Sequence, residues 1–523
     1  MWVYQEIRTL GDIPRYHARE RPDATALISE GRRIDFRELD LLSNQVANAL
    51  LAMTEATGSR VGYLGKNTWR VPVALFGAAK AGLTFMPLNW RLAPAEITTI
   101  VHDSDCRIIF ADEELLGMLE PIRAQADLKV KIVALPAIDT GPSDWSRFLA
   151  GHADTDACLD VATSVTALQV YTSGTSGLPK GVELAHESFN YIRLCEHLDP
   201  GVPWSAQDIF LMFMPNFHTA GTGLMLQSLY NGSAVSMLQA FDAALVLQTI
   251  RETRPSITLI VPSALQLLLE HPEAKNVDFT CFRLCMYAGS PIALPLIKLA
   301  MQQMRCKFVQ WYGATETLGA TTFLRAEQHR LDDEKKLKSC GTPLPLIDIR
   351  IVDGTGAQLP AGQVGEILVR SPAMFKGYWR KPAETAAAKV NGWYHTGDAG
   401  YCDDEGFLYI HDRIKDMIVS GGENVYSAEV ERVLHQHPAV ADVAVIGVPD
   451  PKWGEGVKAL VILRAGSNAT GDELIAFCRT LIGGYKVPKS VEFRDDFPRT
   501  ASGKIQKGPL RAPYWQGSTR AVG

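Results

Sequence analysis

Apolar residues occur along this chain in two patterns, one typical of amphipathic helices and one typical of buried strands. In residues 36–50 they recur at intervals of three and four, which predicts a helix. Asp35 directly precedes this segment and Glu38 follows three residues later, so we expect Asp35 to cap the helix and Glu38 to reach back to the backbone. The apolar positions of this helix are Leu39, Leu42, Val46, Ala49 and Leu50.

Short apolar runs alternate with helical segments from residue 60 onward. A helix of small residues over 71–80, ending at Gly82, separates the first two runs. Strands that alternate with helices predict βαβ units and largely parallel sheets. The predicted strands lie at residues 60–64, 83–88, 167–171, 210–214, 256–261 and 307–311.

The pattern changes after Gly341. Residues 347–352 and 365–369 have the composition of strands, and the turn signals Asp353-Gly354 and Ala361-Gly362 separate them. Few helical stretches lie between these strands. A small antiparallel β unit is therefore expected in this part of the chain.

A second change occurs near residues 412–416. Beyond it we expect a helix at 427–435 and an apolar strand at 440–448, followed by alternating elements. This change predicts a domain boundary. The expected parts are an N-terminal domain at residues 1–412, a hinge at 413–416 and a C-terminal domain at 417–523.

Composition places the chain among ordinary globular proteins. Its 523 residues are too many for one hydrophobic core, so two or more domains are expected. With 46% hydrophobic residues, 21% charged residues and a net charge of −6, nothing favours a nucleic-acid partner. The nine cysteines include no C-x-x-C pair, the first residues show no secretory signal, and no apolar run is long enough to span a membrane. The expectation is a cytoplasmic enzyme with free thiols, whose oligomeric state stays open, a homodimer included.

The most informative segment is a glycine-rich run, Tyr171–Gly181, at the end of one predicted strand. It holds three glycines, four aliphatic hydroxyl side chains and one lysine, Lys180, with almost no apolar bulk. Backbone N–H groups, hydroxyls and a mobile cation are what a phosphate cradle requires. A Walker A loop is excluded, because Pro179 stands five residues after Gly174 where that loop needs glycine. The alternative is a flexible surface linker rich in Ser, Thr and Gly.

Further polar motifs follow in a fixed order along the chain. They are QWYGATET at 310–317, WYHTGD at 393–398, HDRIKD at 411–416, SGGENVY at 420–426 and PRTASGK at 498–504. Together with the glycine-rich run, over roughly residues 10–510, they closely resemble the adenylate-forming superfamily of acyl-CoA synthetases, peptide-synthetase adenylation domains and beetle luciferases. The SGGENVY block and the chain length are most similar to medium- or long-chain fatty acyl-CoA ligases.

This resemblance implies both a fold and a reaction. The implied fold is α/β, with two βα sheets and a small distorted β-barrel in a large N-terminal region and a smaller, mobile α+β C-terminal domain. In the implied reaction a carboxylate attacks the α-phosphate of ATP, pyrophosphate leaves, and the thiol of coenzyme A then displaces AMP from the acyl-adenylate. The protein's task is to position the reactants and stabilise charge, with Mg²⁺ as the expected metal.

The resemblance also implies a role for individual residues in nucleotide binding. Those implied for the ATP phosphates are Thr172, Ser173, Gly174, Thr175 and Lys180. Those implied for adenine, ribose and the neighbouring backbone are Gly289, Ser290, Tyr312, Gly313, Thr315, Asp398 and Arg413. Glu316 is a hard oxygen ligand beside the predicted phosphate site and is the candidate Mg²⁺ ligand. Taken singly, Lys180 and Glu316 would be solvated surface residues and Tyr312 a core residue.

Further residues are implied for the two half-reactions. Lys504 is the expected catalytic cation for adenylation, with an exposed C-terminal lysine as the alternative. Lys415 matches the hinge between the domains, and Gly421 and Gly422 match the tunnel for the pantetheine of coenzyme A. His218 matches an aromatic position between the acyl and thiol sites, although a single histidine in an apolar segment is usually structural.

The acyl pocket contains the main departure from the family pattern. Trp311 stands where many fatty and aryl ligases have a small residue, so it is expected to narrow or cap the pocket if it faces the acyl group. Met214 and Val261 are expected in the apolar wall. Gly313 stands where acetate-specific relatives have a blocking tryptophan, which argues against acetate as the best substrate. The leading interpretation is thus an acid:CoA ligase that acts on an apolar acid. The expected substrate is a medium- or long-chain fatty acid.

Other functions share the same motifs. A ligase that transfers the acyl group to a carrier protein, a ligase for an aromatic or alicyclic acid, and a light-emitting oxygenase all fit this pattern. A non-catalytic nucleotide-binding protein is a further alternative. The presence of Lys504, Glu316 and Asp398 argues against that alternative.

Overall fold

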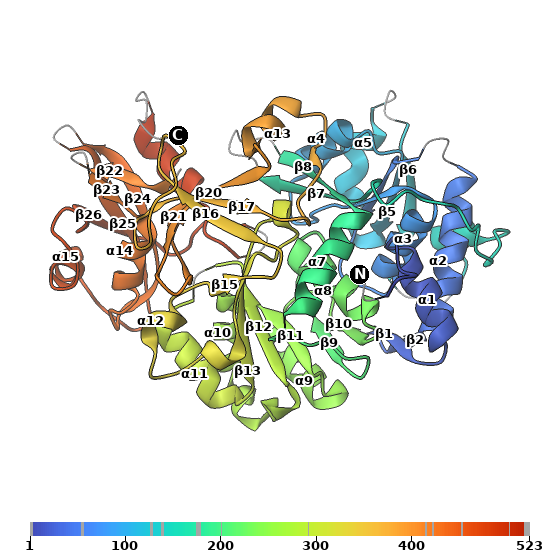
Figure 1. Ribbon diagram of the computed structural model, residues 1–523, viewed down its shortest axis with the longest axis horizontal. Helices are drawn as coiled ribbons and strands as arrows, with labels where there is room; N and C mark the ends of the chain where they lie inside the picture. Colours follow the sequence, from blue (N-terminus) through green and yellow to red (C-terminus); the bar gives the residue numbers. More distant parts are fainter. Residues whose placement is uncertain are drawn as a thin grey trace.

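The computed structural model describes the chain with short gaps. The described residues are 4–53, 57–125, 129–137, 141–173, 179–199, 201–290, 292–413, 416–420, 423–450, 453–500 and 503–516. Figure 1 shows a large N-terminal domain in blue to orange and a smaller C-terminal domain, in orange and red, beside it. This is the mixed α/β architecture that the sequence and its resemblance predict.

The first large sheet carries several of the candidate site residues. Its strands run in the order β15-β14-β13-β12-β11-β9-β10-β1-β2, and the pairs from β1 through β13 along this order are parallel. The bounds are β1 Thr25–Ser29, β2 Arg32–Asp35, β9 Ile209–Met212, β10 Ala234–Met237, β11 Ile257–Ile260, β12 Leu284–Ala288, β13 Lys307–Tyr312, β14 Thr322–Leu324 and β15 Thr342–Pro343. Parallel strands that end at one edge bring the loops after β11, β12 and β13 together.

The second sheet holds the glycine-rich run. Its order is β18-β8-β7-β4-β3-β5-β6, and β7 pairs antiparallel with β8, so the described ends of the run, 171–173 and 179–181, lie on the two strands of a hairpin. The bounds are β3 Arg60–Leu64, β4 Thr84–Pro87, β5 Ile108–Asp112, β6 Lys131–Leu135, β7 Thr166–Ser173, β8 Pro179–Ala185 and β18 Gly377–Tyr378. Lys180 therefore lies on a strand, directly across from Thr172.

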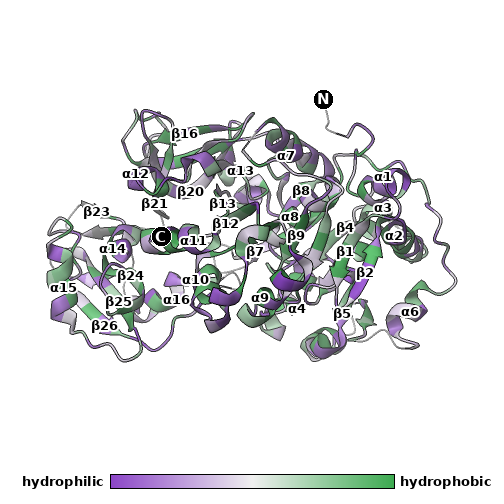
Figure 2. Ribbon diagram, turned by 90° about the horizontal axis from the view of Figure 1, so that it is seen from below, coloured by the Kyte–Doolittle hydropathy of each residue, from purple (hydrophilic) through white to green (hydrophobic). Residues whose placement is uncertain are grey.

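Helices cover the faces of both sheets. Their bounds are α1 Asp12–Glu20, α2 Phe36–Leu51, α3 Arg70–Lys80, α4 Pro94–Ser104, α5 Glu120–Arg123, α6 Asp144–Leu149, α7 His186–Leu198, α8 Thr219–Tyr230, α9 Ala243–Thr253, α10 Pro262–Glu270, α11 Leu294–Met304 and α12 Glu334–Leu337. Strands such as β1 are green and exposed helices such as α1 carry purple residues in Figure 2, as expected if apolar side chains lie between the layers. One continuous core spans both sheets.

The small antiparallel β unit expected after Gly341 is present. It consists of β16 Asp348–Val352, β17 Gly365–Arg370, β19 Lys389–Val390, β20 Trp393–Cys402 and β21 Leu408–Arg413, with α13 Pro382–Ala388 before β19. Strand β20 pairs with both β17 and β21 and carries the WYHTGD motif.

The C-terminal domain has its own sheet and its own apolar cores. Strands β22 Ile418–Ser420, β23 Glu423–Val425, β24 Val440–Asp450, β25 Gly454–Leu463 and β26 Ser490–Phe493 form the sheet. The helices are α14 Ser427–Leu434, α15 Gly471–Arg479 and α16 Lys507–Arg511. No helix in the described part of the chain is long and apolar enough to cross a membrane.

At two helix starts a polar side chain binds a nearby cation. Asp35 does cap α2, because its carboxylate accepts a hydrogen bond from the backbone N–H of Glu38 at 2.7 Å. The Glu38 carboxylate, however, pairs with Arg32 on β2 rather than reaching back. At α14 the N-cap position is Tyr426, and the hydroxyl of Ser427 accepts a hydrogen bond from Lys507 instead. In both cases a nearby cation competes with the local backbone for the side chain.

Candidate active site

Tyr312 and Asp398 meet where the first sheet approaches the small antiparallel unit. The Tyr312 hydroxyl donates to Asp398 Oδ2 at 2.8 Å. Burial, followed by the Asp398 charge, raises the pKa of Tyr312 well above its usual value, so the phenol keeps its proton. The local backbone of β20 positions the carboxylate, since Gly397 has a φ of +69° and the Asp398 N–H donates to the Thr396 hydroxyl at 3.0 Å. The residues expected at the ribose and adenine are thus brought together.

Glu316 and Lys180 converge on a tyrosine that the sequence analysis did not identify, Tyr378. The Tyr378 hydroxyl donates to Glu316 Oε1 at 2.8 Å, and Lys180 Nζ lies 5.1 Å from the centre of the same ring. Glu316 is buried, with 8% of its surface exposed. Burial and then the Glu316 charge raise the pKa of Tyr378. A cation, a buried carboxylate and a hydroxyl therefore face one region beside the glycine-rich hairpin.

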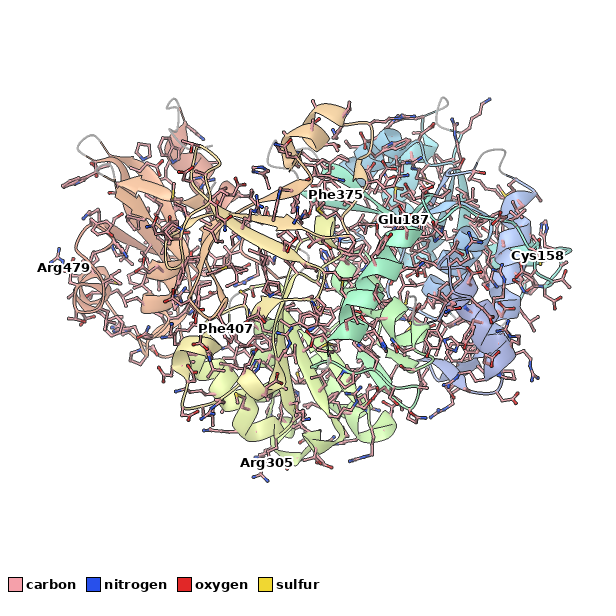
Figure 3. All side chains as sticks on the ribbon, in the orientation of Figure 1. Cys158, Glu187, Arg305, Phe375, Phe407 and Arg479 are labelled. Atoms are coloured by element: carbon pink, nitrogen blue, oxygen red, sulfur yellow. The ribbon has the colours of Figure 1, made fainter. Side chains whose placement is uncertain are left out.

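Tyr378 packs in a small aromatic cluster. Phe375, labelled in Figure 3, packs with its ring centroid 5.0 Å from that of Tyr378 and 5.7 Å from that of Tyr394. The Phe375 N–H also donates to the backbone oxygen of Glu316 at 2.8 Å. Strand β18 joins β8 through the register Tyr378↔Val182, which brings these residues to the glycine-rich hairpin. The sequence signal was a Gly-Tyr-Trp segment with aromatic neighbours, which by itself does not differ from a core strand.

The C-terminal domain reaches this site through Lys504. A Cβ atom placed on Gly289 would lie 3.9 Å from Lys504 Cε, so glycine allows a close approach of the lysine to the end of β12. The preceding Gly503 has a φ of +84°, and a Cβ there would lie 3.2 Å from the Ser263 hydroxyl at the start of α10. A tight turn holds this loop, because the Lys504 carbonyl accepts a hydrogen bond from the Thr500 N–H at 2.7 Å. Lys504 itself is exposed.

His218 is at the N-cap of α8, near the same lysine. Burial, followed by the positive charges of Lys504 and Arg91, lowers the pKa of His218 to about 4. The imidazole is therefore neutral near pH 7. Its Nε2 atom is buried and has no hydrogen-bond partner among the residues described. A neutral ring nitrogen without a partner, close to an ammonium group, favours a site role over a purely structural one.

The expected acyl wall is apolar and mostly buried. Met214 is 5% exposed and Trp311 7% exposed, whereas Val261 is only partly buried. A Cβ on Gly289 would lie 3.4 Å from Val261 Cγ1, so Val261 borders the segment that Lys504 approaches. Trp311 is in register with Ala288, the residue before Gly289.

Gly313 has a structural reason of its own to be glycine. A Cβ atom there would lie 2.5 Å from the carbonyl carbon and oxygen of Gly319. Any side chain would require the 313–319 segment to move. The backbone packing by itself therefore requires glycine at this position.

The remaining predicted residues are placed in part. Ser290 follows Gly289 and is half-buried, Thr315 begins a short 3-10 helix at Thr315–Thr317, and Thr172 is half-buried on β7. Ser173 and Arg413 end β7 and β21, and their side chains are outside the described set. Gly174, Thr175, Lys415, Gly421 and Gly422 lie outside the described residues.

Comparisons with known proteins agree with this geometry. Residues 15–379 match the model of the AMP-binding enzyme family, and residues 429–504 match that of the AMP-binding enzyme C-terminal domain. A fatty acid–[acyl-carrier-protein] ligase, ScoC, of Streptomyces coeruleorubidus is 39% identical, with 99% of each chain covered. A feruloyl-CoA synthase of an Amycolatopsis species is 37% identical over 97% of this chain and 99% of its own.

A solved structure gives the same result in three dimensions. ATP-bound MatB from Rhodopseudomonas palustris superposes with a TM-score of 0.88 at 28% sequence identity, covering 96% of this chain and 99% of its own. The two matching family models together span both domains of the present chain. The protein therefore belongs to the family of AMP-binding, adenylate-forming enzymes, and it is an acid-activating ligase.

Proposed function

We propose that the protein is an AMP-forming acid:CoA ligase acting on an apolar carboxylic acid, most readily a medium- or long-chain fatty acid. The observation that carries the proposal is the approach of Lys504 to Gly289 and His218, because it brings one cation from the C-terminal domain to the site formed by the N-terminal domain. This is the arrangement that adenylation requires. The cysteines within the described residues are all free thiols, which supports a reducing, cytoplasmic location.

Lys504 is assigned to the adenylation step. Its ammonium group would lie between the substrate carboxylate and the α-phosphate, where negative charge is brought together and redistributed. At about 4 Å and an effective dielectric near 20, such a cation interacts with a unit negative charge by roughly 4 kcal/mol. That is sufficient to change the rate by orders of magnitude.

Lys180 and Glu316 are assigned to the phosphate end of ATP. Lys180, with Thr172, Ser173, Gly174 and Thr175, would hold the β- and γ-phosphates. Glu316 would bind Mg²⁺, which supplies charge neutralisation on the phosphates. One buried carboxylate beside a phosphate site fits this metal, which commonly takes one or two protein carboxylates and completes its shell with phosphate oxygens and water. The Tyr378 hydroxyl would fix the orientation of that carboxylate.

Asp398 and Tyr312 are assigned to the nucleoside. The Asp398 carboxylate would accept two hydrogen bonds from the ribose diol, assisted by Arg413, and the Tyr312 ring would stack on adenine beside Gly289 and Ser290. The hydrogen bond between Tyr312 and Asp398 couples these two contacts. Thr315 and Gly313 belong to the backbone segment that joins them to Glu316.

The second half-reaction is assigned to a different orientation of the C-terminal domain. We place the boundary at 413–416, between the end of β21 and the start of β22, with Lys415 as the hinge residue. Rotation would remove Lys504 and bring Gly421 and Gly422 to the pantetheine of coenzyme A. His218 would then border the acyl group and the incoming thiol.

A carrier protein is the second candidate acceptor. One specific observation favours it, namely the 39% identity over nearly the full length to a relative named as a fatty acid–[acyl-carrier-protein] ligase. An aromatic acid is the second candidate substrate, because a feruloyl-CoA synthase is 37% identical. Both alternatives share the first half-reaction. The first differs in the thiol that accepts the acyl group, and the second differs in the shape of the acyl pocket.

The test is pyrophosphate release from ATP over a panel of acids, from acetate to palmitate together with benzoate, cinnamate and ferulate. Each acid is assayed with coenzyme A, with a phosphopantetheinylated carrier protein, and with neither. Thioester formation that needs coenzyme A and is greatest with one apolar class is expected. Thioester formed only on the carrier protein would show that the carrier protein, and not coenzyme A, accepts the acyl group. The absence of pyrophosphate release with every acid would overturn the proposal.

A further inference from the structure

The indole nitrogen of Trp311 is a buried hydrogen-bond donor without a partner. The side chain is 7% exposed, and its Nε1 atom contacts no acceptor among the residues that the structure describes. Buried tryptophan N–H groups usually do find a partner, because burying one without an acceptor costs its full hydration free energy. Phenylalanine at this position would pack a similar ring without that cost. The polar atom therefore calls for an explanation beyond packing.

The indole is held in one orientation beside the predicted reaction centre. Its ring stacks on Phe323 of β14, with centroids 4.4 Å apart and an interplanar angle of 26°. On its other side, Trp311 is in register with Ala288 of β12. The next residue, Gly289, is the one approached by Lys504 and bordered by Val261. Trp311 therefore lies beside the end of β12, next to the segment that Val261 and Lys504 border.

An indole N–H can donate a hydrogen bond but cannot accept one. Its missing partner must therefore be an acceptor, such as an ether, carbonyl or hydroxyl oxygen. We propose that the natural acid carries such an acceptor on its otherwise apolar acyl group, and that Trp311 selects for it by donating its Nε1–H. This inference rests on the proposed ligase function and names the substrate class within it, since a site that donates a hydrogen bond discriminates against analogues that lack the acceptor.

His218, near Lys504, offers a second nitrogen atom of the same kind. Its Nε2 is also buried without a partner among the described residues, and its ring is neutral. A purely hydrocarbon acyl group would leave Trp311 Nε1 unpaired in the complex, because the carboxylate of the acid can pair with only one of the two nitrogen atoms. An acid with one oxygen in its acyl group can satisfy Trp311, and it leaves His218 for the carboxylate or thiol end.

The chain offers a matched control in Trp204. Its Nε1 atom likewise lacks a partner within the described residues, and its ring packs edge-on against Phe210 at 6.1 Å. Trp204, however, lines a separate cavity of about 220 Å³ together with Glu196, Gln227 and Tyr230. Replacing either tryptophan with phenylalanine removes the same atom, but only one replacement is made beside the predicted acyl site.

The experiment compares acids that differ by one atom. The straight-chain acid that the enzyme uses best is paired with analogues in which one methylene at successive positions is replaced by an ether oxygen or a carbonyl group. For each pair, the ratio of kcat/KM for the oxygen-bearing acid to kcat/KM for its parent is measured in the wild type, Trp311→Phe and Trp204→Phe. Because each ratio is formed within one variant, a general loss of activity cancels.

At one oxygen position the ratio is expected to fall roughly fivefold to tenfold in Trp311→Phe, the effect of one neutral hydrogen bond. It should remain at its wild-type value in Trp204→Phe. Equal ratios in wild type and Trp311→Phe at every position would overturn the proposal, as would the same fall in both variants. No activity with any acid would instead refute the ligase function on which the proposal rests.

Discussion

At the scale of single residues, the ammonium group of Lys504 is the contact on which the proposed chemistry depends. It comes from a loop that packs its own backbone through Thr500 and reaches an N-terminal domain surface formed by two small residues, Gly289 and Ser263. Small side chains at that surface leave room for a ligand beside the lysine. The sequence motif predicted the lysine's identity, and the structure adds the backbone turn that delivers it.

Lys504→Ala is expected to lower the rate of acid-dependent pyrophosphate release by at least about 100-fold, because it removes a cation worth roughly 4 kcal/mol at the transition state. The same variant should still convert supplied acyl-adenylate and coenzyme A to thioester. Stopped-flow or radiolabel assays of the two half-reactions measure both effects. Lys298→Ala, on α11, serves as the control and should retain both steps. Equal loss of the two half-reactions in Lys504→Ala would contradict the assigned role.

Trp311→Gly is expected to enlarge the acyl pocket. Removal of the indole should raise kcat/KM for longer acids at least about tenfold relative to shorter ones, in line with the discrimination that a hydrophobic pocket achieves per methylene. Loss of the stack on Phe323 should also lower the unfolding midpoint. A chain-length profile measured at a temperature where the variant is folded separates the two effects. An unchanged profile would place the indole outside the pocket.

At the scale of secondary-structure elements, Gly341 allows the edge strand β15 to pack against β14 in the first sheet. It precedes β15, has a φ of +76°, and a Cβ atom there would lie 1.8 Å from the Phe323 carbonyl oxygen. Phe323 in turn supports Trp311 across the β13–β14 pair. The glycine therefore lets β15 and the loop before it lie against the strand behind the predicted acyl pocket.

Gly341→Ala is expected to destabilise the fold by more than about 3 kcal/mol, since backbone strain and a clash with a neighbouring strand act together. Gly356→Ala provides the matched control, because Gly356 has a φ of +85° but no atom within 4 Å of its virtual Cβ. The control should cost only about 1–2 kcal/mol. Urea unfolding of both variants compares the two costs. Similar values would show that strain alone, without the clash, accounts for the effect.

The elements themselves were largely predictable, and their partners were not. Continuous apolar runs located β3 at Arg60–Leu64 to the residue and β13 to within one residue. The run after β7 was correctly separated from a Walker A loop, but β8 went unrecognised because Pro179 and Lys180 do not resemble the start of a buried strand. Its pairing with β7 comes from tertiary contacts that no local pattern contains. Tyr378 was missed for the same reason.

At the scale of the whole molecule, buried histidines couple stability to pH. Burial lowers the pKa of each of four histidines to about 4, whereas the value in the unfolded chain is 6.5. On acidification the unfolded chain therefore binds protons that the native state does not bind. Their contribution to stability is complete above pH 6.5 and is lost as the pH falls toward 4. The residues are His17, His186, His218 and His329.

Two buried carboxyl groups act in the opposite direction. Burial raises the pKa of Glu196 to about 7 and that of Asp112 to about 6, so acidification favours the native state at these sites.

The effect of the four histidines is larger than that of the two carboxyl groups. Lowering the pH from 7 to 5 should therefore reduce the free energy of unfolding by roughly 4 kcal/mol. Unfolding midpoints at the two pH values test this expectation. His329→Gln should reduce the pH dependence, and a pH-independent midpoint would contradict the account.

Domain-scale organisation was predictable where composition changes and motifs recur in order. The α/β class, the antiparallel unit after Gly341 and the smaller C-terminal domain all follow from such changes. The order of strands in the sheets does not, because it depends on long-range packing. The sequence analysis predicted no element over residues 25–34, yet β1 and β2 form one edge of the first large sheet.

That edge has a consequence for how the protein is made. Leu27 of β1 is in register with Val235 of β10, ~200 residues further along the chain, and both are fully buried in the finished sheet. At a synthesis rate of about 5–20 residues per second, the β1–β2 hairpin leaves the ribosome roughly 10–40 s before its partner strand exists. During that interval its apolar side chains have no sheet to join. Slow translation or scarce chaperones should therefore lower the yield of this enzyme through its first 35 residues, far from the chemistry that it performs.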